Sequence, residues 1–374
     1  AAIGVERGDN VAVMLNNRLE YLWSWFGLSR IGAVHVGINT ALKGRFLTHV
    51  LTNTKARIGF FDPEFLPWLA DIEDAVPDLQ TVYIPGDAYD PDRLPAFKRI
   101  EIRSFDEIMG GVADEIDVPV SYRDIGMIMF TSGTTGPSKG TLMPHGHLYL
   151  FGQCMVEDLA MTDQDHYFIA MPLFHVQGIL MQAFATMIAG GSAVLMKQFH
   201  ASTWIDDIRK HKATLTNLLG VMNDFVLRQP AKPTDADNDL RMVCALPVTA
   251  DTLQALRSRF NIPKFNEVFG MTECNLPVSR PFDAPDDAGC SGRVREDYFE
   301  VIIADPDTDE ELPYGQVGEI LVRPKEPFCF MAGYNAMPER TVEVWRNFWF
   351  HSGDAGRMDA RGFLWYIDRI KDTI

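Results

Sequence analysis

The first half of the chain alternates short apolar runs with longer amphipathic segments. Strand-like runs at 10–15 (NVAVML), 34–38 (VHVGI) and 57–61 (RIGFF) are separated by segments whose apolar residues recur at helical spacing. Strands separated by helices of about 10–15 residues pair in parallel, because a helical crossover returns the chain to the same end of the sheet. The pattern therefore predicts an α/β fold.

The pattern of predicted strands and helices changes twice along the chain. A second alternating stretch follows, and from about residue 286 short strands are joined by Asp, Gly and Pro turns, which is typical of antiparallel sheet. The strand candidates of the second stretch are HYFIAM, SAVLM, ATLTNLL, LRMVCAL and FNEVFG. We expect an α/β subdomain over 1–160, a second α/β subdomain over 161–285 and a β-rich subdomain over 286–374.

Two segments depart from the alternation. Residues 85–120 carry many Pro and Asp residues and are predicted to form a surface connection. From Val176 to Met196 there is no charged residue, but polar residues and the pair Gly190–Gly191 interrupt the run. We interpret this second segment as a buried helix that ends at the glycines, followed by a buried strand, and not as a membrane span.

Charge and cysteine content exclude several classes of protein. The 374 residues include 34 Lys and Arg against 51 Asp and Glu, a net charge of −17, so an excess of positive charge cannot drive binding to nucleic acid or anionic membranes. Five cysteines without a CxxC pair argue against a disulfide framework or a zinc site. A cytoplasmic protein is expected, and because the chain begins without Met we expect both termini of a longer protein to be missing.

Residues 130–140 (FTSGTTGPSKG) form a loop that is suited to bind phosphate. Glycines let backbone amides approach an anion, hydroxyls donate further hydrogen bonds and Lys139 supplies positive charge. The P-loop pattern does not fit, because Ser138 occupies the place of its second glycine and Gly140 follows the lysine where Ser or Thr is required. The lysine is also followed by a strand-like segment instead of a helix. A flexible surface loop is the other alternative.

The loop resembles the signature of the adenylate-forming superfamily, which includes acyl-CoA synthetases and other AMP-dependent synthetases and ligases. Pro137 and Ser138 stand in swapped order relative to its usual form, which leaves Lys139 in register. Further segments resemble family motifs in the expected order: MPLFHV (171–176), FGMTE (269–273), FHSGDAG (350–356) and the approach to the hinge at 362–374. Residues 7–39 and 199–222 are similar to the carnitine/crotonobetaine–CoA ligase branch.

This resemblance implies a fold and a reaction. The fold is the large N-terminal domain of the acyl-CoA synthetase/luciferase-like architecture, with two packed α/β subdomains and a small antiparallel β-barrel, and with the C-terminal domain absent from this chain. The reaction is the ATP- and Mg-dependent activation of a small carboxylic acid to an acyl-adenylate, followed by transfer to coenzyme A. Partners would be the acid and coenzyme A, without nucleic acid or an integral membrane segment, in a monomer or homodimer.

The resemblance also assigns roles to individual residues. The catalytic residues would be Thr272, Glu273, Lys139 and His175. Nucleotide would be bound by Thr131, Ser132, Gly133, Thr134, Thr135, Gly136, Lys139, Ala245, Phe269, Gly270, Met271, Thr272, Asp354 and Arg369. Glu273 and Thr134 would hold the metal, His175, Val176, Gly220 and Val221 would line the acyl pocket, and Lys371 would be the hinge residue.

Two other functions stay open at this stage. The chain could be an adenylation domain that loads a carrier protein, although MPLFHVQG lacks the Asp that usually pairs with an amino acid's α-amine. It could also be a truncated nucleotide-binding module without full activity. Substrate identity is not predicted by any of these patterns.

Overall fold

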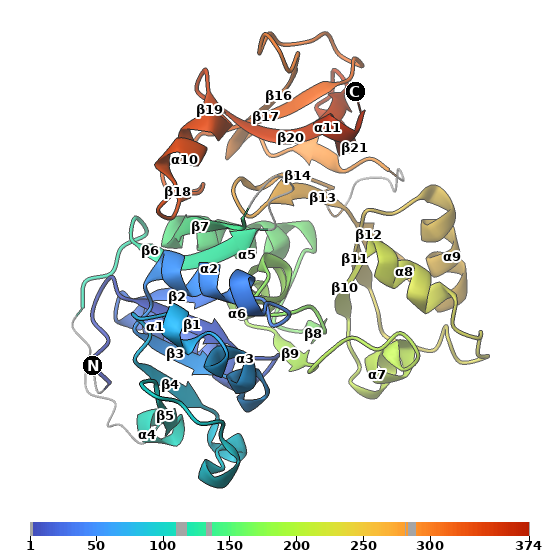
Figure 1. The fold of residues 1–374 in the computed structure, drawn as a ribbon. Coiled ribbons are helices and arrows are strands. Elements are labelled where there is room, and N and C mark those ends of the chain that lie inside the picture. The colour runs from blue at the N-terminus through green and yellow to red at the C-terminus, as the bar shows by residue number, and fades with distance from the viewer. Residues whose placement is uncertain (1–2, 110–117, 132–136, 281, 283–288, 374) are drawn as a thin grey trace. The chain divides into compact units, whose positions relative to one another are not determined.

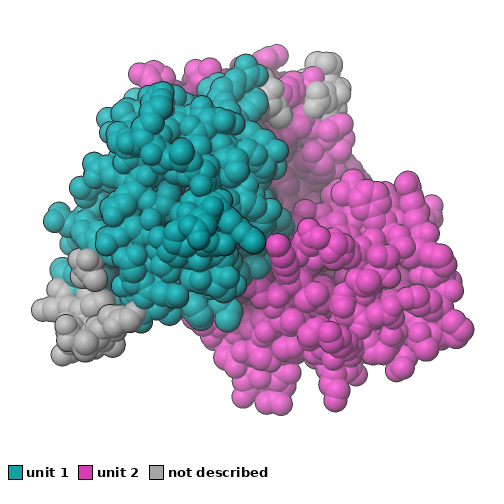
Figure 2. Space-filling view, turned by 60° about the horizontal axis from the view of Figure 1, so that its bottom comes forward, with its two compact units in different colours: residues 1–148, 172–179, 331–338 teal, residues 149–171, 180–330, 339–374 magenta. Residues whose placement is uncertain are grey.

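The computed structural model describes residues 3–109, 118–131, 137–280, 282 and 289–373. These residues form two compact units, coloured separately in Figure 2. Unit 1 comprises residues 1–148, 172–179 and 331–338, and unit 2 comprises residues 149–171, 180–330 and 339–374.

The sheet of unit 1 confirms the α/β prediction. Its strands follow the order β18-β7-β6-β2-β1-β3-β4-β5, and those from β6 to β5 pair in parallel (Figure 1). The strands are β1 (Asn10–Met14), β2 (Val34–Gly37), β3 (Ile58–Phe61), β4 (Thr81–Ile84), β5 (Glu101–Ser104), β6 (Ile125–Thr131), β7 (Lys139–Pro144) and β18 (Gly333–Tyr334). The apolar runs of β1, β2 and β3 are buried almost throughout, as central parallel strands covered on both faces must be.

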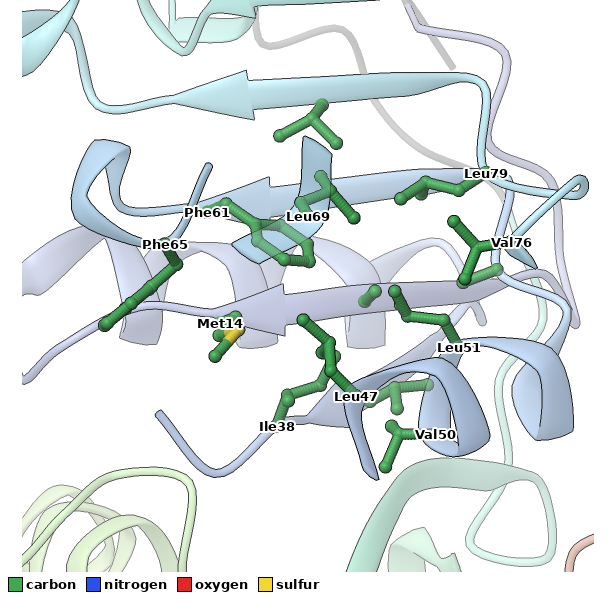
Figure 3. Packing of buried hydrophobic residues seen from close by; sticks show 14 of the residues in the cluster. Met14, Ile38, Leu47, Val50, Leu51, Phe61, Phe65, Leu69, Val76 and Leu79 are labelled. Carbon is green, nitrogen blue, oxygen red and sulfur yellow. The ribbon is translucent and has the colours of Figure 1, made fainter. Parts of the chain in front are cut away.

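In the described part of unit 1, three helices bury apolar side chains and a fourth, the shortest, buries none. The helices are α1 (Leu19–Arg30), α2 (Gly44–Thr54), α3 (Leu66–Ala70) and α4 (Asp106–Met109). In α2 the buried residues Leu47, Val50, Leu51 and Thr54 recur at helical spacing, so they lie on one face. Figure 3 shows Leu47 and Leu51 packed in one cluster with strand residues such as Met14. Burial of each such side chain contributes about 1.5–3 kcal/mol to folding.

The prediction of a surface connection over 85–120 was partly wrong. Residues Glu101–Ser104 form β5, which pairs in parallel with β4 and is the last strand of the sheet. Among the described residues β5 pairs with β4 alone, and its Glu101 is exposed. An edge strand of this kind lacks the continuous apolar run that identified the central strands.

Unit 2 contains a second parallel sheet with the order β12-β11-β10-β8-β9. Its strands are β8 (His166–Ile169), β9 (Ser192–Leu195), β10 (Leu215–Leu219), β11 (Met242–Leu246) and β12 (Phe265–Asn266). The helices α7 (Trp204–Lys210), α8 (Gly220–Leu227) and α9 (Ala250–Phe260) supply Trp204, Met222 and Leu256 to the core beneath it. The predicted alternation of strands and helices in this part of the chain is therefore confirmed.

The uncharged segment from Val176 to Met196 is helical up to the glycines, as predicted. A π-helical stretch (Gln177–Phe184) leads into α6 (Ala185–Ala189), which ends at Gly190 with a φ of 72°. The strand after it, β9, is not buried: it is the edge strand of its sheet, and its Ser192 and Ala193 are exposed. The remaining long helix is α5 (His145–Asp158). Among the described residues, no helix is both long enough and apolar enough to cross a bilayer.

The β-rich region of unit 2 is an antiparallel sheet with the order β13-β14-β15-β21-β20-β17-β16, and β19 pairs with β20. In the described part of the chain, the predicted small barrel is therefore an open sheet whose first and last strands are β13 and β16. Its elements are β13 (Val268–Met271), β14 (Asn275–Ser279), β15 (Gly292–Val294), β16 (Phe299–Ala304), β17 (Gly318–Pro324), α10 (Pro338–Val344), β19 (Trp345–Arg346), β20 (Trp349–Met358), β21 (Phe363–Arg369) and α11 (Ile370–Thr373).

The predicted single strand FNEVFG was wrong. It divides at Glu267 into β12, which belongs to the parallel sheet, and β13, which belongs to the antiparallel sheet. The buried Glu267 accepts a hydrogen bond from the equally buried Arg280 at 3.0 Å, so the change of sheet coincides with a buried ion pair.

A strained turn between β19 and β20 provides a stability prediction. Its two residues, Asn347 and Phe348, have φ angles of 48° and 65°, and Phe348 is 85% exposed. A bulky residue in this left-handed conformation is unfavourable, whereas glycine adopts it freely. We therefore expect Phe348→Gly to raise the free energy of unfolding by about 1 kcal/mol, measured by urea denaturation.

Phe348→Ala is the matched control for this prediction, because it removes the same ring but keeps Cβ. It should give a clearly smaller increase than Phe348→Gly. Equal effects of the two substitutions would show that the exposed ring, and not the backbone conformation, is the source of instability.

Candidate active site

The predicted phosphate loop connects two antiparallel strands of unit 1. Thr131 at the end of β6 lies opposite Lys139 at the start of β7. Because Lys139 begins a strand and not a helix, the structure excludes the P-loop alternative. The predicted nucleotide-binding residues Ser132, Gly133, Thr134, Thr135 and Gly136 lie outside the described residues.

The C-terminal end of this loop, at Ser138 and Lys139, contacts two other elements of unit 1. The ammonium of Lys139 lies 4.6 Å from the centroid of the Tyr334 ring of β18. The carbonyl oxygen of Ser138 accepts a hydrogen bond from His49 Nε2 of α2 at 2.8 Å. Neither His49 nor Tyr334 was predicted, because both lie far from the loop in the sequence and neither belongs to a motif that we recognised.

The predicted acyl-pocket residues of unit 1 lie where a turn passes into a helix. The turn is fixed by the Leu173 amide, which donates to Asn17 Oδ1 at 2.8 Å. His175 is exposed, and its Nδ1 accepts from the Gln177 amide at 3.3 Å. Val176 is buried. An exposed imidazole at the end of a turn is able to contact a ligand, whereas Val176 contributes to packing.

The FGMTE motif forms the tip of the β13–β14 hairpin in unit 2. Met271 pairs with Asn275, so Thr272 and Glu273 occupy the connection between the strands. Gly270 is required there, because a Cβ atom at this position would lie 2.2 Å from the Asn275 carbonyl oxygen. The side chain positions are enclosed: Thr272 is 8% and Glu273 is 3% exposed. A turn this tight holds Glu273 in a defined place.

The aromatic residue of the same motif packs against another strand. Phe269 is buried, and its ring is stacked on Tyr366 of β21, with a centroid distance of 6.2 Å and an interplanar angle of 28°. Tyr366 is 37% exposed. The sequence did not indicate Tyr366, which belongs to the same strand as Arg369.

Asp354 and Arg369 face each other on adjacent strands. They are directly opposite in the β20–β21 pairing, and Arg369 Nε lies 3.1 Å from Asp354 Oδ1. Ser352, which stands where the family more often has Thr, donates to the Ile320 carbonyl at 2.6 Å and accepts from the Asp354 amide at 3.1 Å. The serine hydroxyl therefore supports the part of β20 that precedes Asp354.

Negative charge accumulates around Asp354. Burial raises the pKa of the Asp354 carboxyl to about 6; Arg369 lowers this pKa, and the carboxylates of Glu319 and Glu273 raise it. Glu319 also accepts from the Gly353 amide at 2.9 Å. The Glu273 carboxylate thus acts on Asp354 within unit 2, although the two residues are 81 positions apart in the sequence.

The other predicted site residues of unit 2 differ in accessibility. Ala245 is fully buried in the core that α7, α8 and α9 complete, and its predicted contact with nucleotide stays a prediction. Gly220 and Val221 begin α8, and Val221 is 65% exposed. Lys371 is exposed in α11. The predicted residues therefore fall into two sets, one in each unit.

Comparisons with known proteins agree with these motifs. A family model described as AMP-binding enzyme matches residues 1–335. The crotonobetaine/carnitine–CoA ligase of Salmonella typhi is 31% identical over 374 residues, which covers 98% of this chain and 70% of the relative. The same relative from Salmonella paratyphi C is 30% identical, with the same coverage.

Solved structures show the same fold. ATP-bound MatB from Rhodopseudomonas palustris matches with a TM-score of 0.86 and 26% identity, over 100% of this chain and 71% of that protein. The anthranilate CoA ligase AuaEII in complex with anthranoyl-AMP matches with a TM-score of 0.88 at 24% identity, over 100% of this chain and 70% of that protein. The relatives are named CoA ligases, and the family model is described as AMP-binding enzyme. The chain belongs to the AMP-binding enzyme family, a group of AMP-forming acid–thiol ligases.

Proposed function

We propose that this protein uses ATP and Mg²⁺ to convert a small carboxylic acid into its acyl-adenylate and then into a coenzyme A thioester. The observation that carries this proposal is the pairing of the buried Asp354 of β20 with Arg369 of β21, in the same unit as the buried Glu273 at the tip of the β13–β14 hairpin. Two buried anions near one cation suit a ligand that combines a sugar, phosphates and a metal ion.

The first half-reaction needs positioning more than proton transfer. A carboxylic acid with a pKa of about 4 is ionised at neutral pH, so one of its oxygens attacks the α-phosphorus without a general base. The new O–P bond forms as the bond to the β-phosphate oxygen breaks, and pyrophosphate leaves with that electron pair. Lys139 and the Thr131 hydroxyl would neutralise charge on the phosphates. A thiolate then attacks the acyl carbon, and AMP leaves.

The nucleotide would be bound mainly by the residues of unit 2. The Asp354 carboxylate has two oxygens that would accept hydrogen bonds from the two ribose hydroxyls, and Arg369 would lie on the opposite side of the ribose. The hydroxyl of Thr272 would donate to the α-phosphate. The hairpin strand containing Phe269, Gly270 and Met271 would lie beside the adenine.

The residues present fit a magnesium ion. Among the described residues no cluster of three or more His, Cys, Asp or Glu side chains could hold a metal, so a site made by protein alone is not expected there. Mg²⁺ instead commonly binds through one or two carboxylates together with substrate phosphates. Glu273 would be that carboxylate, and the predicted second ligand Thr134 lies outside the described residues. The ion would supply charge neutralisation at the phosphate oxygens.

The acyl group would lie against exposed apolar side chains near the start of α8. Val221 and Phe225 are four residues apart on this helix, and they are 65% and 49% exposed. Exposed apolar residues on one helix face are suited to bind the hydrocarbon part of an acid. The role of His175 in acyl binding and that of Lys371 as the hinge residue stay predictions. Because relatives are named crotonobetaine/carnitine–CoA ligases, betaine acids are the first candidates, and Phe225 offers a face for a quaternary ammonium.

The decisive experiment is carboxylate-dependent exchange of labelled pyrophosphate into ATP. A panel should include crotonobetaine, carnitine, malonate, anthranilate and straight-chain acids. We expect exchange that requires both the acid and Mg²⁺, and thioester formation with free coenzyme A. Exchange followed by loading of a carrier protein but not of coenzyme A would favour a carrier-loading enzyme. Nucleotide binding without exchange for any acid would overturn the proposal.

The raised pKa of Asp354 predicts a pH dependence of nucleotide binding. Below its pKa of about 6 the carboxyl is protonated and loses the charge that favours two accepted hydrogen bonds. The affinity for AMP should therefore fall by roughly tenfold for each pH unit below this pKa. Calorimetric titration of AMP into the wild type and into Asp354→Asn checks this. The phosphate of AMP also titrates in this pH range, but it affects both proteins equally, so the difference between their affinities reports on Asp354. Parallel pH profiles for both proteins would contradict the assigned role.

A further inference from the structure

The ammonium of Lys139 rests on a fixed aromatic ring. Its Nζ lies 4.6 Å from the centroid of Tyr334, within the range in which a cation is attracted to the negative face of a ring. Lysine side chains have four rotatable carbons and lose several rotamers when one position is held. The contact with Tyr334 therefore selects among the positions that Lys139 can adopt at the end of the phosphate loop.

Tyr334 itself has little freedom to move. Its ring is 4% exposed, and its strand β18 pairs with β7 so that Tyr334 lies opposite Thr141. The neighbouring Asn335 amide donates to the Gly140 carbonyl at 2.7 Å. The Asn335 side chain donates to Asn53 of α2, and Asn53 Nδ2 donates back to the Asn335 carbonyl at 3.1 Å. Strand pairing and helix contact together place the ring.

The C-terminal end of the loop is also held by helix α2, through Ser138. His49 of α2 donates to the Ser138 carbonyl at 2.8 Å, and its ring contacts Phe130 of β6 edge-on at 6.2 Å. The arm from Ser138 to Gly140 is therefore bound by α2 through one contact and by β18 through another. A charged group that is held before its ligand arrives loses less conformational entropy on binding.

We propose that Tyr334 is a positioning residue for the adenylation step, whose ring orients the Lys139 ammonium toward the phosphates of ATP. This inference rests on the proposed function, in which the loop ending at Lys139 binds those phosphates. It assigns a role to β18, which follows the loop by almost two hundred residues in the sequence. Residues 331–338, which include β18, belong to unit 1, whereas the residues before and after them belong to unit 2. Tyr334 contributes through its ring face, so phenylalanine should replace it.

A double-mutant cycle between Tyr334 and Lys139 tests the proposal. Tyr334→Leu should lower kcat/KM for ATP in pyrophosphate exchange by between about 2-fold and 30-fold, the range of a cation–π contact. KM for the acid should not change, and Tyr334→Phe should retain the wild-type value. In a Lys139→Met background, Tyr334→Leu should have no further effect. The Kd of ATP, measured by calorimetry, should follow the same pattern.

Each failure has a distinct signature. If Tyr334→Leu lowers kcat/KM equally in both backgrounds, the ring is structural and this proposal is wrong, although the proposed function stands. If Lys139→Met leaves kcat/KM for ATP unchanged, the phosphate role of the loop fails, and this proposal fails with it. Thermal unfolding of each variant controls for loss of structure, and Tyr334→Met, which fills similar space without a ring, replaces the leucine variant should that one not fold.

Discussion

Replacing Glu273 with glutamine should lower carboxylate-dependent pyrophosphate exchange by about 10²–10³-fold, the cost typical of removing one charge-stabilising group from an active site. Glutamine has nearly the same size and keeps one oxygen, so the hairpin tip between β13 and β14 should fold unchanged. The substitution removes the negative charge that a hard divalent cation prefers. We also expect the variant to require a higher Mg²⁺ concentration for half-maximal exchange.

A second measurement for Glu273→Gln does not depend on activity. The Glu273 carboxylate contributes to the raised pKa of Asp354, so its removal should lower that pKa. The pH at which AMP affinity begins to fall should then move below its wild-type value of about 6. Glu310→Gln is the matched control, because Glu310 is exposed in the same unit and should affect neither measurement. Wild-type exchange in Glu273→Gln would remove the basis for the metal assignment.

Replacing Arg280 with methionine should destabilise the protein by about 3–5 kcal/mol, because it leaves a buried carboxylate without its partner. Arg280 and Glu267 have side chains only 3% and 6% exposed. Arg280 Nη2 also donates to the Cys290 carbonyl at 2.8 Å, so the substitution removes a second buried hydrogen bond. Urea denaturation followed by circular dichroism measures the change.

Two variants make the Arg280 prediction specific. Arg361→Met removes an exposed arginine that pairs with Asp359, and it should change stability by no more than about 1 kcal/mol. The double variant Arg280→Met with Glu267→Leu should recover much of the lost stability, because no buried charge is left unpaired. If the double variant is as unstable as Arg280→Met, then lost packing and not an uncompensated charge is the cause.

Local patterns in the sequence predicted the elements whose signal is contained in a few adjacent residues. The strands β1, β2 and β3 were predicted from apolar runs that are buried on both faces in a parallel sheet. The end of the uncharged helix was predicted from Gly190, because glycine accepts the left-handed conformation found there. The edge strand β5 was missed and the edge strand β9 was wrongly predicted to be buried, because one open side permits polar or small residues.

The α/β class, the loop that ends at Lys139 and the family motifs could be predicted, since each depends on residues close together in the chain. Which distant residues meet could be learned only from the folded protein: Asp354 with Arg369, Phe269 with Tyr366, and Lys139 with Tyr334. Strand pairing brings these partners together, and the register of a pairing depends on the packing of whole sheets. A short motif contains no information about such a register.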